Sequence, residues 1–409
     1  MVKNILRIKF RAGLFENPYF KEREKFVLLD SASLTFAKTA AIKSFVLLKN
    51  ENNILPLTTT KKIAVIGPLA NAPKEQLGTW IFDGNKNDSQ TPLTALQKMY
   101  GAENIHYVAG LTYSRDESHE GFEQAYKAAK KSEVVLFFAG EEAILSGEAH
   151  SRADIRLPGA QERLIHKLHK AGKPIVLIIM AGRPIVIEHL LPYVSAVVMA
   201  WHPGTMAGPA LAEVLSGKEN FTGKLPVTWP KMVGQIPIYY NHTNTGRPAD
   251  SASFVGIKDI PIEAWQSSLG NNSHYLDAGY TPQYPFGYGL SYTRFTYSKS
   301  TIEKNTLTKN DSLIVTKTVT NAGNRSGTET VQLYVQDVTA SLVRPVRELK
   351  AFVRVELKAG ETKTVRFAVA VSDLGFYNNA GAYVIEPGIF NLWVAPDASG
   401  GIKQSFEVK

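Results

Sequence analysis

The chain has 409 residues, 44% of them hydrophobic and 20% charged, which excludes a mainly disordered protein and favours two or three folded domains. The net charge of +9 is spread along the chain without a long basic block, so we expect no nucleic-acid partner. The absence of cysteine excludes disulfides, thiolate catalysis and zinc sites built on Cys. No apolar run approaches the roughly 20 residues that span a bilayer, so we expect no membrane-spanning segment.

Residues 1–35 are predicted to be a linker. The first ten residues have the pattern of an amphipathic helix with Ile5, Leu6 and Ile8 on one side, and a turn is expected at 16–19. Scattered charges argue against a signal peptide. Because the helical pattern begins abruptly, we expect a further segment upstream of it.

Residues 36–235 are predicted to form an α/β domain. Apolar residues at helical spacing, including Phe36 and Phe45, predict a helix over 33–49. Buried strands and amphipathic helices then alternate, which is typical of a mostly parallel sheet covered on both faces. Strands are expected at 63–67, 105–108, 134–138, 175–179 and 196–199, and helices at 92–100, 121–131, 158–171 and 208–215.

The chain changes character after this domain. Residues 236–297, rich in Gly, Pro and aromatic residues, are predicted to be a connecting region. From 298 to 409 apolar residues alternate with polar ones, as at Val365, Phe367 and Val369, and turn signals separate the runs. About seven such strands predict an all-β, fibronectin type III-like sandwich.

The loop over 139–158 is the candidate site. It joins a predicted buried strand to a helix and is several times longer than the usual 2 to 6 residues of such connections. Ligands of open parallel sheets bind beyond the carboxyl ends of the strands, where this loop begins. Its charged or titratable side chains include Glu141, Glu142, Glu148, His150, Arg152 and Asp154.

Other chemistries lack their motifs. Residues 63–67 are not followed by the glycines of a dinucleotide fold, and 217–225 have the wrong spacing for a phosphate loop. His166 and His169 lie on a helix beside lysines, which favours a solvated face over a metal site. We therefore expect no cofactor and no metal.

A glutamate in a polar loop is ordinarily a solvated side chain. Glu148 differs in its setting, because Gly147 permits close approach of the backbone, and His150 and Arg152 can orient a sugar or a second carboxylate. From the residues alone the solvated interpretation remains the leading one.

Four long stretches resemble family 3 glycoside hydrolases, with the nearest likeness to bacterial periplasmic β-glucosidases. They are LSGEAHSRADIRLPGAQ, AGKPIVLIIMAGRPIVI, the run from WHPGTMAG to NTGRP, and YPFGYGLSYTRF. That family has a barrel, then an α/β sandwich domain and often a fibronectin type III-like domain, and this chain is similar to the last two. The resemblance implies an N-terminal barrel domain as a partner in the full-length protein.

The resemblance also implies a retaining mechanism with two carboxyl groups. Glu148 matches the general acid/base of the family, whereas the nucleophile is an Asp in a Ser-Asp-Trp motif of the barrel, a motif that this sequence lacks. The chain alone is therefore expected to be inactive. His150 and Arg152 match the surrounding motif as substrate-binding residues, although a structural salt bridge of Arg152 is an equal alternative. Trp80 resembles a residue of a second loop over the sugar, where it would stack on a ring, with a core Trp as the alternative.

The implied substrate is a terminal β-D-glucoside or a related oligosaccharide, and the implied location is periplasmic or secreted. The alternative from another class is a noncatalytic carbohydrate-binding or scaffold protein that retains the same modules. The oligomeric state does not follow from the sequence.

Overall fold

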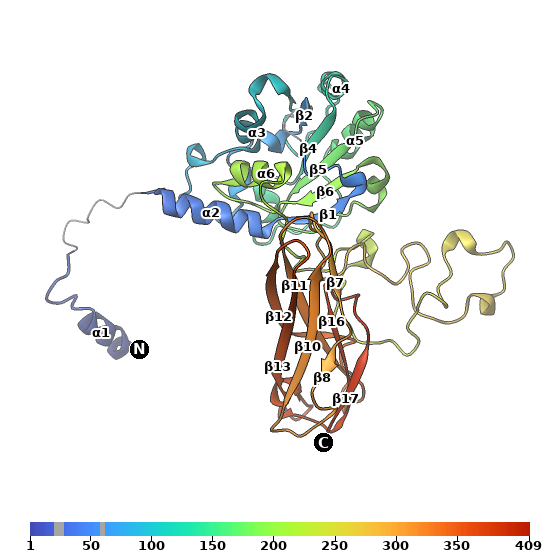
Figure 1. The fold of residues 1–409 in the computed structure, drawn as a ribbon. Helices are drawn as coiled ribbons and strands as arrows, with labels where there is room; N and C mark the ends of the chain where they lie inside the picture. Colours follow the sequence, from blue (N-terminus) through green and yellow to red (C-terminus); the bar gives the residue numbers. More distant parts are fainter. Residues whose placement is uncertain (20–27, 58–61) are drawn as a thin grey trace. The chain divides into compact units, whose positions relative to one another are not determined.

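The computed structural model describes residues 1–19, 28–57 and 62–409, which divide into two units, 1–36 and 37–409. In the first unit α1 (Val2–Arg11) buries none of its side chains, and Ile5 and Ile8 are more than half exposed. Part of the predicted linker, 20–27, lies outside the described residues. Figure 1 shows the elements in chain order.

The prediction of a helix over 33–49 is wrong in its C-terminal part, and one of its apolar residues is not buried. Phe36, one of the apolar residues whose spacing predicted the helix, is 77% exposed. The helix α2 (Ser31–Ser44) stops before a strand, β1 (Val46–Asn50), in which Val46, Leu47 and Leu48 are all buried. Successive buried side chains point to opposite faces of a sheet, so burying all of them requires a sheet covered on both sides.

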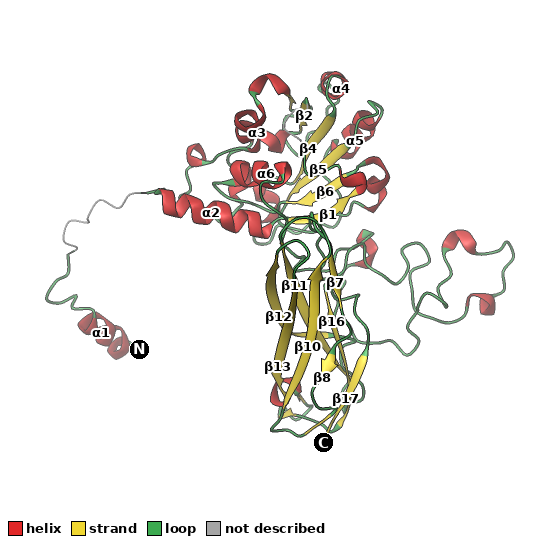
Figure 2. Cartoon of the chain, viewed as in Figure 1, coloured by secondary structure: helices red, strands yellow, loops and turns green. Residues whose placement is uncertain are grey.

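A six-stranded sheet forms the centre of the α/β domain, with the order β1-β6-β5-β4-β2-β3. Only β1 is antiparallel within this sheet, to β6, and the remaining neighbours are parallel, which confirms the predicted mostly parallel α/β sandwich. Figure 2 shows these strands between helices. The other strands are β2 (Ile63–Ile66), β3 (Ile105–Val108), β4 (Val134–Gly140), β5 (Ile175–Met180) and β6 (Ala196–Met199).

Helices cover both faces of this sheet. One buried cluster includes side chains of α4 (Phe122–Lys130) and α5 (Gln161–His169). The cluster on the other face includes α2, α3 (Pro92–Tyr100) and α6 (Ala207–Ser216). Both faces of the sheet are therefore packed against helices, and function is left to the loops at the ends of the strands.

The strand order creates a switch point. From β2 the chain runs to β3 on one side, and it then crosses β2 to place β4 on the other side. Loops leaving the carboxyl ends of β2 and β4 consequently diverge, which opens the crevice where ligands of such sheets bind.

The connecting region leaves the α/β domain and returns to it. Trp229 is fully buried, and its indole nitrogen donates to the carbonyl of Ile185 at 2.8 Å. The backbone nitrogen of Trp229 donates to the carbonyl of Tyr284, so the two ends of the excursion lie side by side. Between them, short 3-10 turns occur at Val233–Gln235, Ile257–Asp259 and Gln266–Leu269.

The last part of the chain is a sandwich of two sheets with its own buried core, as the fibronectin type III-like prediction requires. One sheet has the order β13-β10-β7, with β8 on β10, and the other β12-β11-β16-β17-β9. Alternate residues of the long strands point inward, which explains the period-two pattern of the sequence. The strands are β7 (Phe295–Tyr297), β8 (Thr301–Ile302), β9 (Thr306–Leu307), β10 (Ser312–Asn321), β11 (Gly327–Asp337), β12 (Glu348–Leu357), β13 (Thr362–Ala370), β16 (Gly388–Ala395) and β17 (Gln404–Val408), with a hairpin of β14 (Phe376–Tyr377) and β15 (Tyr383–Val384).

A buried ion pair connects the sandwich to the preceding chain. Lys224 Nζ lies 2.9 Å from Glu329 Oε1, and the side chains are 14% and 7% exposed. Burial raises the pKa of Glu329, and Lys224 opposes this shift. Lys224 therefore stabilises the charged form of this buried carboxylate.

We expect Lys224→Met to lower the free energy of unfolding by about 3–5 kcal/mol at pH 7, because Glu329 is left buried without its partner. Urea denaturation measures the loss. Lys363→Met is the matched control, since its pair with Glu361 is exposed and should contribute under about 1 kcal/mol. Equal small losses in the two variants would contradict the structural role of the pair.

Candidate active site

Four loops meet at the carboxyl ends of parallel strands. Glu141 directly follows β4, Arg183 follows β5 closely, and His202 follows β6, while Gly78 lies in the loop after β2. A Cβ on Gly78 would lie 3.3 Å from His202 Cβ, and one on Gly182 would lie 3.3 Å from His202 Nε2. The loops are thus in close contact at the predicted crevice.

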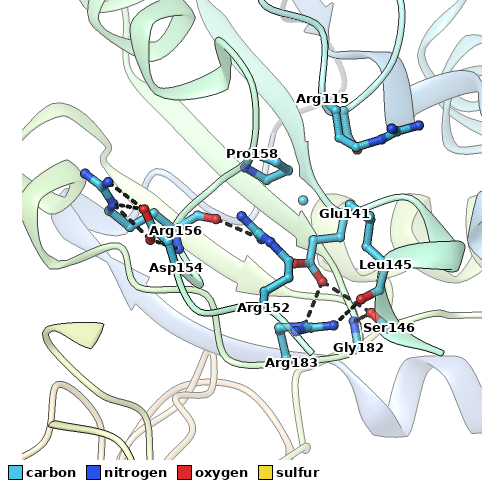
Figure 3. A network of polar contacts seen from close by, with 12 residues as sticks. Arg115, Glu141, Leu145, Ser146, Arg152, Asp154, Arg156, Pro158, Gly182 and Arg183 are labelled. Carbon is cyan, nitrogen blue, oxygen red and sulfur yellow. Dashed lines mark hydrogen bonds and ion pairs between the residues drawn. The ribbon is translucent and has the colours of Figure 1, made fainter. Parts of the chain in front are cut away.

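Glu141 lies at the centre of a polar network (Figure 3). Its side chain is fully buried, and Arg183 Nε lies 3.0 Å from its Oε2. Arg152 Nη1 donates to Oε1, and Ser146 Oγ donates to Oε2 at 3.3 Å. Two guanidinium groups therefore compensate one buried carboxylate, which would otherwise be costly to desolvate.

The same arginines hold the long loop. Arg183 Nη2 donates to the carbonyl oxygens of Leu145 and, at 3.0 Å, His150. Arg152 Nη1 also donates to the carbonyl of Arg156 at 3.0 Å. Glu141 thus orients two arginine side chains, and these bind the loop backbone before and after residues 147–149. Because Glu141 directly follows β4, the loop is held to the end of that strand.

Glu148 lies at the tip of the turn that these contacts support. His150 N donates to the Gly147 carbonyl at 3.0 Å, and Ala149 has a positive φ of 60°. The side chain of Glu148 is exposed, and within the described ranges it has no hydrogen-bond or ion-pair partner. Its carboxyl group is therefore free to act on a ligand.

The other carboxylates of the loop are engaged. Arg115 Nε lies 2.9 Å from Glu142 Oε2, and this hydrogen bond lowers the pKa of Glu142. Arg156 binds Asp154 through both carboxylate oxygens and lowers its pKa to about 2. A carboxyl group held in its charged form cannot deliver a proton near neutral pH.

The loop after β2 packs against the long loop. Glu75 Oε2 accepts a hydrogen bond from Ala143 N at 2.7 Å. A Cβ on Gly147 would lie 2.9 Å from His150 Nδ1 and 3.2 Å from Thr79 Oγ1, so a glycine fits best before Glu148. Trp80 follows, with its side chain 60% exposed, so it is not the core residue considered as an alternative.

Arg152 and His150 have different surroundings. The Arg152 side chain is 21% exposed and bound to Glu141, so the structural salt bridge considered from the sequence is present, and a sugar-binding role remains a prediction. His150 is exposed, with Nδ1 2.5 Å from the Ile144 carbonyl oxygen. The structure brings His150 to the same turn as Glu148, and Arg152 beneath it.

Sequence reasoning missed Arg183, His202 and Glu75 as parts of this site. Arg183 and His202 each follow a buried strand closely, and this position in the sequence could have identified them as candidate site residues. Burial lowers the pKa of His202, which the nearby charge of Glu141 opposes. Among the described residues, no group of three or more His, Asp or Glu is arranged to hold a metal, and no helix is long and apolar enough to cross a membrane.

We expect Glu141→Gln to destabilise the protein by about 3 kcal/mol, because two partly buried guanidinium groups lose their counter-charge. Amide hydrogen exchange over 143–157 should accelerate. Asp154→Asn is the control: its pair with Arg156 is half exposed, so a change below about 1 kcal/mol is expected. Unchanged exchange in Glu141→Gln would show that the network does not hold the loop.

His202 should make stability depend on pH. Because its pKa is lowered in the folded state, the unfolded chain takes up a proton first as pH falls below about 6.5, and the free energy of unfolding decreases. His202→Gln removes this contribution. Denaturation between pH 7 and 5 should show a shallower loss in the variant than in the unchanged protein, and parallel profiles would contradict the assignment.

Two known domain families match this chain. Residues 45–292 match the Glycosyl hydrolase family 3 C-terminal domain, and residues 329–398 match the Fibronectin type III-like domain. The periplasmic β-glucosidase of Salmonella typhimurium is 37% identical over 99% of this chain and 55% of that protein. A β-xylosidase of Formosa agariphila is 34% identical over 95% of this chain and 52% of that protein.

Among solved structures, the β-glucosidase of Listeria innocua in complex with isofagomine superposes with a TM-score of 0.90 and 38% identity, over 98% of this chain and 54% of that one. The chain spans about half the length of these relatives. The fold, the domain order and this similarity together show that the chain belongs to glycosyl hydrolase family 3 and carries its C-terminal domain followed by a fibronectin type III-like domain.

Proposed function

We propose that this chain supplies the general acid/base, Glu148, of a retaining enzyme that hydrolyses terminal β-D-glucosidic bonds. One observation carries the proposal: Glu148 is the carboxyl group of the long loop that no other described side chain engages, and it lies on a turn held from both sides. The relative from Listeria innocua was solved with glucose and with laminaribiose, which supports a β-glucoside as substrate.

The proposed mechanism divides the two carboxyl groups between domains. An Asp of an N-terminal barrel domain attacks the anomeric carbon, while Glu148 protonates the oxygen of the leaving group. Glu148 then removes a proton from the water that hydrolyses the glycosyl-enzyme intermediate. In retaining enzymes the two carboxyl groups lie about 5–5.5 Å apart, and the charge of the nucleophile helps the general acid to keep its proton near neutral pH.

Neighbouring side chains have supporting roles in this proposal. Trp80 offers an exposed ring on which a sugar can stack, and Phe82 packs edge-on against it with centroids 6.3 Å apart. His150 would contact sugar hydroxyl groups from the turn itself, whereas Arg152 would act chiefly by orienting that turn. The periplasmic relative supports a periplasmic or secreted location, and the β-xylosidase relative leaves β-xylose as a second sugar.

The test uses the chain joined to its barrel domain, with the separate chain as comparator. Glu148→Ala should reduce hydrolysis of alkyl glucosides about 10²- to 10⁴-fold, because their leaving groups need a proton, and should affect the first step on activated aryl glucosides much less. Azide should partly restore turnover by attacking the intermediate directly. The separate chain should hydrolyse neither substrate, since the nucleophile is absent from it.

Glu142→Ala is the matched control, because it removes a neighbouring carboxylate that is bound to Arg115. It should show neither the dependence on the leaving group nor the rescue by azide. If Glu142→Ala shows both and Glu148→Ala behaves like the unchanged enzyme, the acid/base is Glu142 and the proposal is wrong.

A further inference from the structure

A hollow of about 1000 Å³ lies between the connecting region and the sandwich. One wall comes from residues within 228–286, and the other includes Val346, Arg347, Ala398 and Ser399. None of its lining residues belongs to the loops after β2, β4, β5 or β6. It is therefore separate from the candidate active site, and its volume is at the upper end of the range for ligand pockets.

The floor of this hollow is a rigid aromatic surface. The rings of Tyr240 and Phe286 stack with centroids 4.3 Å apart and planes 19° apart. Tyr240 also meets the buried Tyr334 edge-on, and its hydroxyl accepts a hydrogen bond from Leu349 N at 3.3 Å. Because these rings pack in a small buried cluster with Tyr334, Trp393 and Ala398 of the sandwich, a ligand would not have to order them.

Three further tyrosines line the hollow and remain open to solvent. Tyr239, Tyr275 and Tyr280 are 60%, 51% and 42% exposed. Within the described residues their hydroxyl groups have no hydrogen-bond partner. Each ring therefore offers an apolar face and a free hydroxyl to the same space, a combination suited to ligands that are apolar on one side and polar on another.

The charged groups among the residues that line the hollow favour a neutral ligand. The lining contains no Asp or Glu, and its permanent charge, Arg347, is already engaged. Arg347 Nη1 donates to the carbonyl oxygens of Ala398 at 2.7 Å and Gly400 at 2.8 Å, and its guanidinium lies 4.2 Å from the ring centre of Trp393. Two histidines, His242 and His274, also line the hollow, and the Nδ1 atom of each lies 3.0 Å from a backbone carbonyl oxygen. A phosphate or carboxylate ligand would thus find no free permanent cation to compensate its desolvation.

Uncharged polar groups complete the surface. Thr243, Asn244 and Thr245 bring hydroxyl and amide groups from one short segment. That segment is anchored to the sandwich, since Val346 N donates to the His242 carbonyl at 2.9 Å. Hydroxyl, amide and aromatic groups together match the hydroxyl groups and apolar ring faces of a sugar.

We propose that this hollow is a binding site for a neutral oligosaccharide, distinct from the site of hydrolysis. Tyr240 and Phe286 form its floor, Tyr239 and Tyr275 stack on sugar rings, and the 243–245 segment supplies hydrogen bonds. The volume suits a short chain of sugars rather than one unit. The site would hold a glycan near the enzyme without taking part in bond cleavage.

The test is calorimetric titration of the 409-residue chain with laminaritriose and with cellotriose. We expect binding of at least one, and we expect Tyr239→Ala/Tyr275→Ala to weaken it at least about tenfold because two ring contacts are lost. Tyr377→Ala removes a 69% exposed tyrosine of the β14–β15 hairpin and should leave affinity within about twofold. Unchanged melting temperatures would show that the variants are folded.

Three results would overturn the proposal. The first is no binding of either sugar. The second is binding that Trp80→Ala abolishes and the double tyrosine variant leaves intact, which would place the sugar at the candidate active site. The third is a fall in the sedimenting mass of the double variant without a change in sugar affinity, which would make the hollow an interface between copies of the chain.

Discussion

The buried carboxylate of Glu141 is the interaction on which the candidate site depends. A charge with a fully buried side chain is stable only if its partners compensate the lost hydration, and here Arg152 and Arg183 do so. Meeting that requirement fixes both guanidinium groups at the end of β4. Their remaining donors bind the loop backbone, so the same charge balance that keeps Glu141 buried also orders the turn that carries Glu148.

The topology of the sheet explains why these residues meet. Glu75, Glu141, Arg183 and His202 are far apart in sequence, but each follows a strand, and the strands are parallel neighbours. Their carboxyl ends therefore lie at one edge. The crossing between β3 and β4 separates the loops at this edge enough to expose Glu148 and Trp80, while Glu75 still bridges them through Ala143 N.

The two polar systems of the molecule use charge differently. In the candidate active site one carboxylate is left exposed while its neighbours Glu142 and Asp154 are neutralised by arginines. In the hollow beside the sandwich, Arg347 already binds backbone carbonyl oxygens, and aromatic and hydroxyl groups remain available to a ligand. The first arrangement suits proton transfer and the second suits neutral recognition.

Much of the fold was predictable from the residues. An apolar run located β6 to the residue, because a strand buried on both faces is apolar throughout. Alternation at Val365, Phe367 and Val369 located β13, because only one face of that strand is buried. The error over 46–49 arose because a short apolar run is compatible with a helix or a strand until its neighbours in the fold are known. The first strand pairs with β6, about 150 residues later, and only that pairing settles its state.

For the site, the sequence by itself determined the long loop after a buried strand and, through family resemblance, the choice of Glu148 among its carboxylates. Only the tertiary structure decided which carboxylates are engaged. Glu141, Glu142 and Glu148 are close in sequence and equally charged, but Arg183, which binds Glu141, comes from the loop after β5, and Arg115, which binds Glu142, comes from the loop after β3. Local sequence cannot specify such partners, because they are brought together by the packing of the whole sheet.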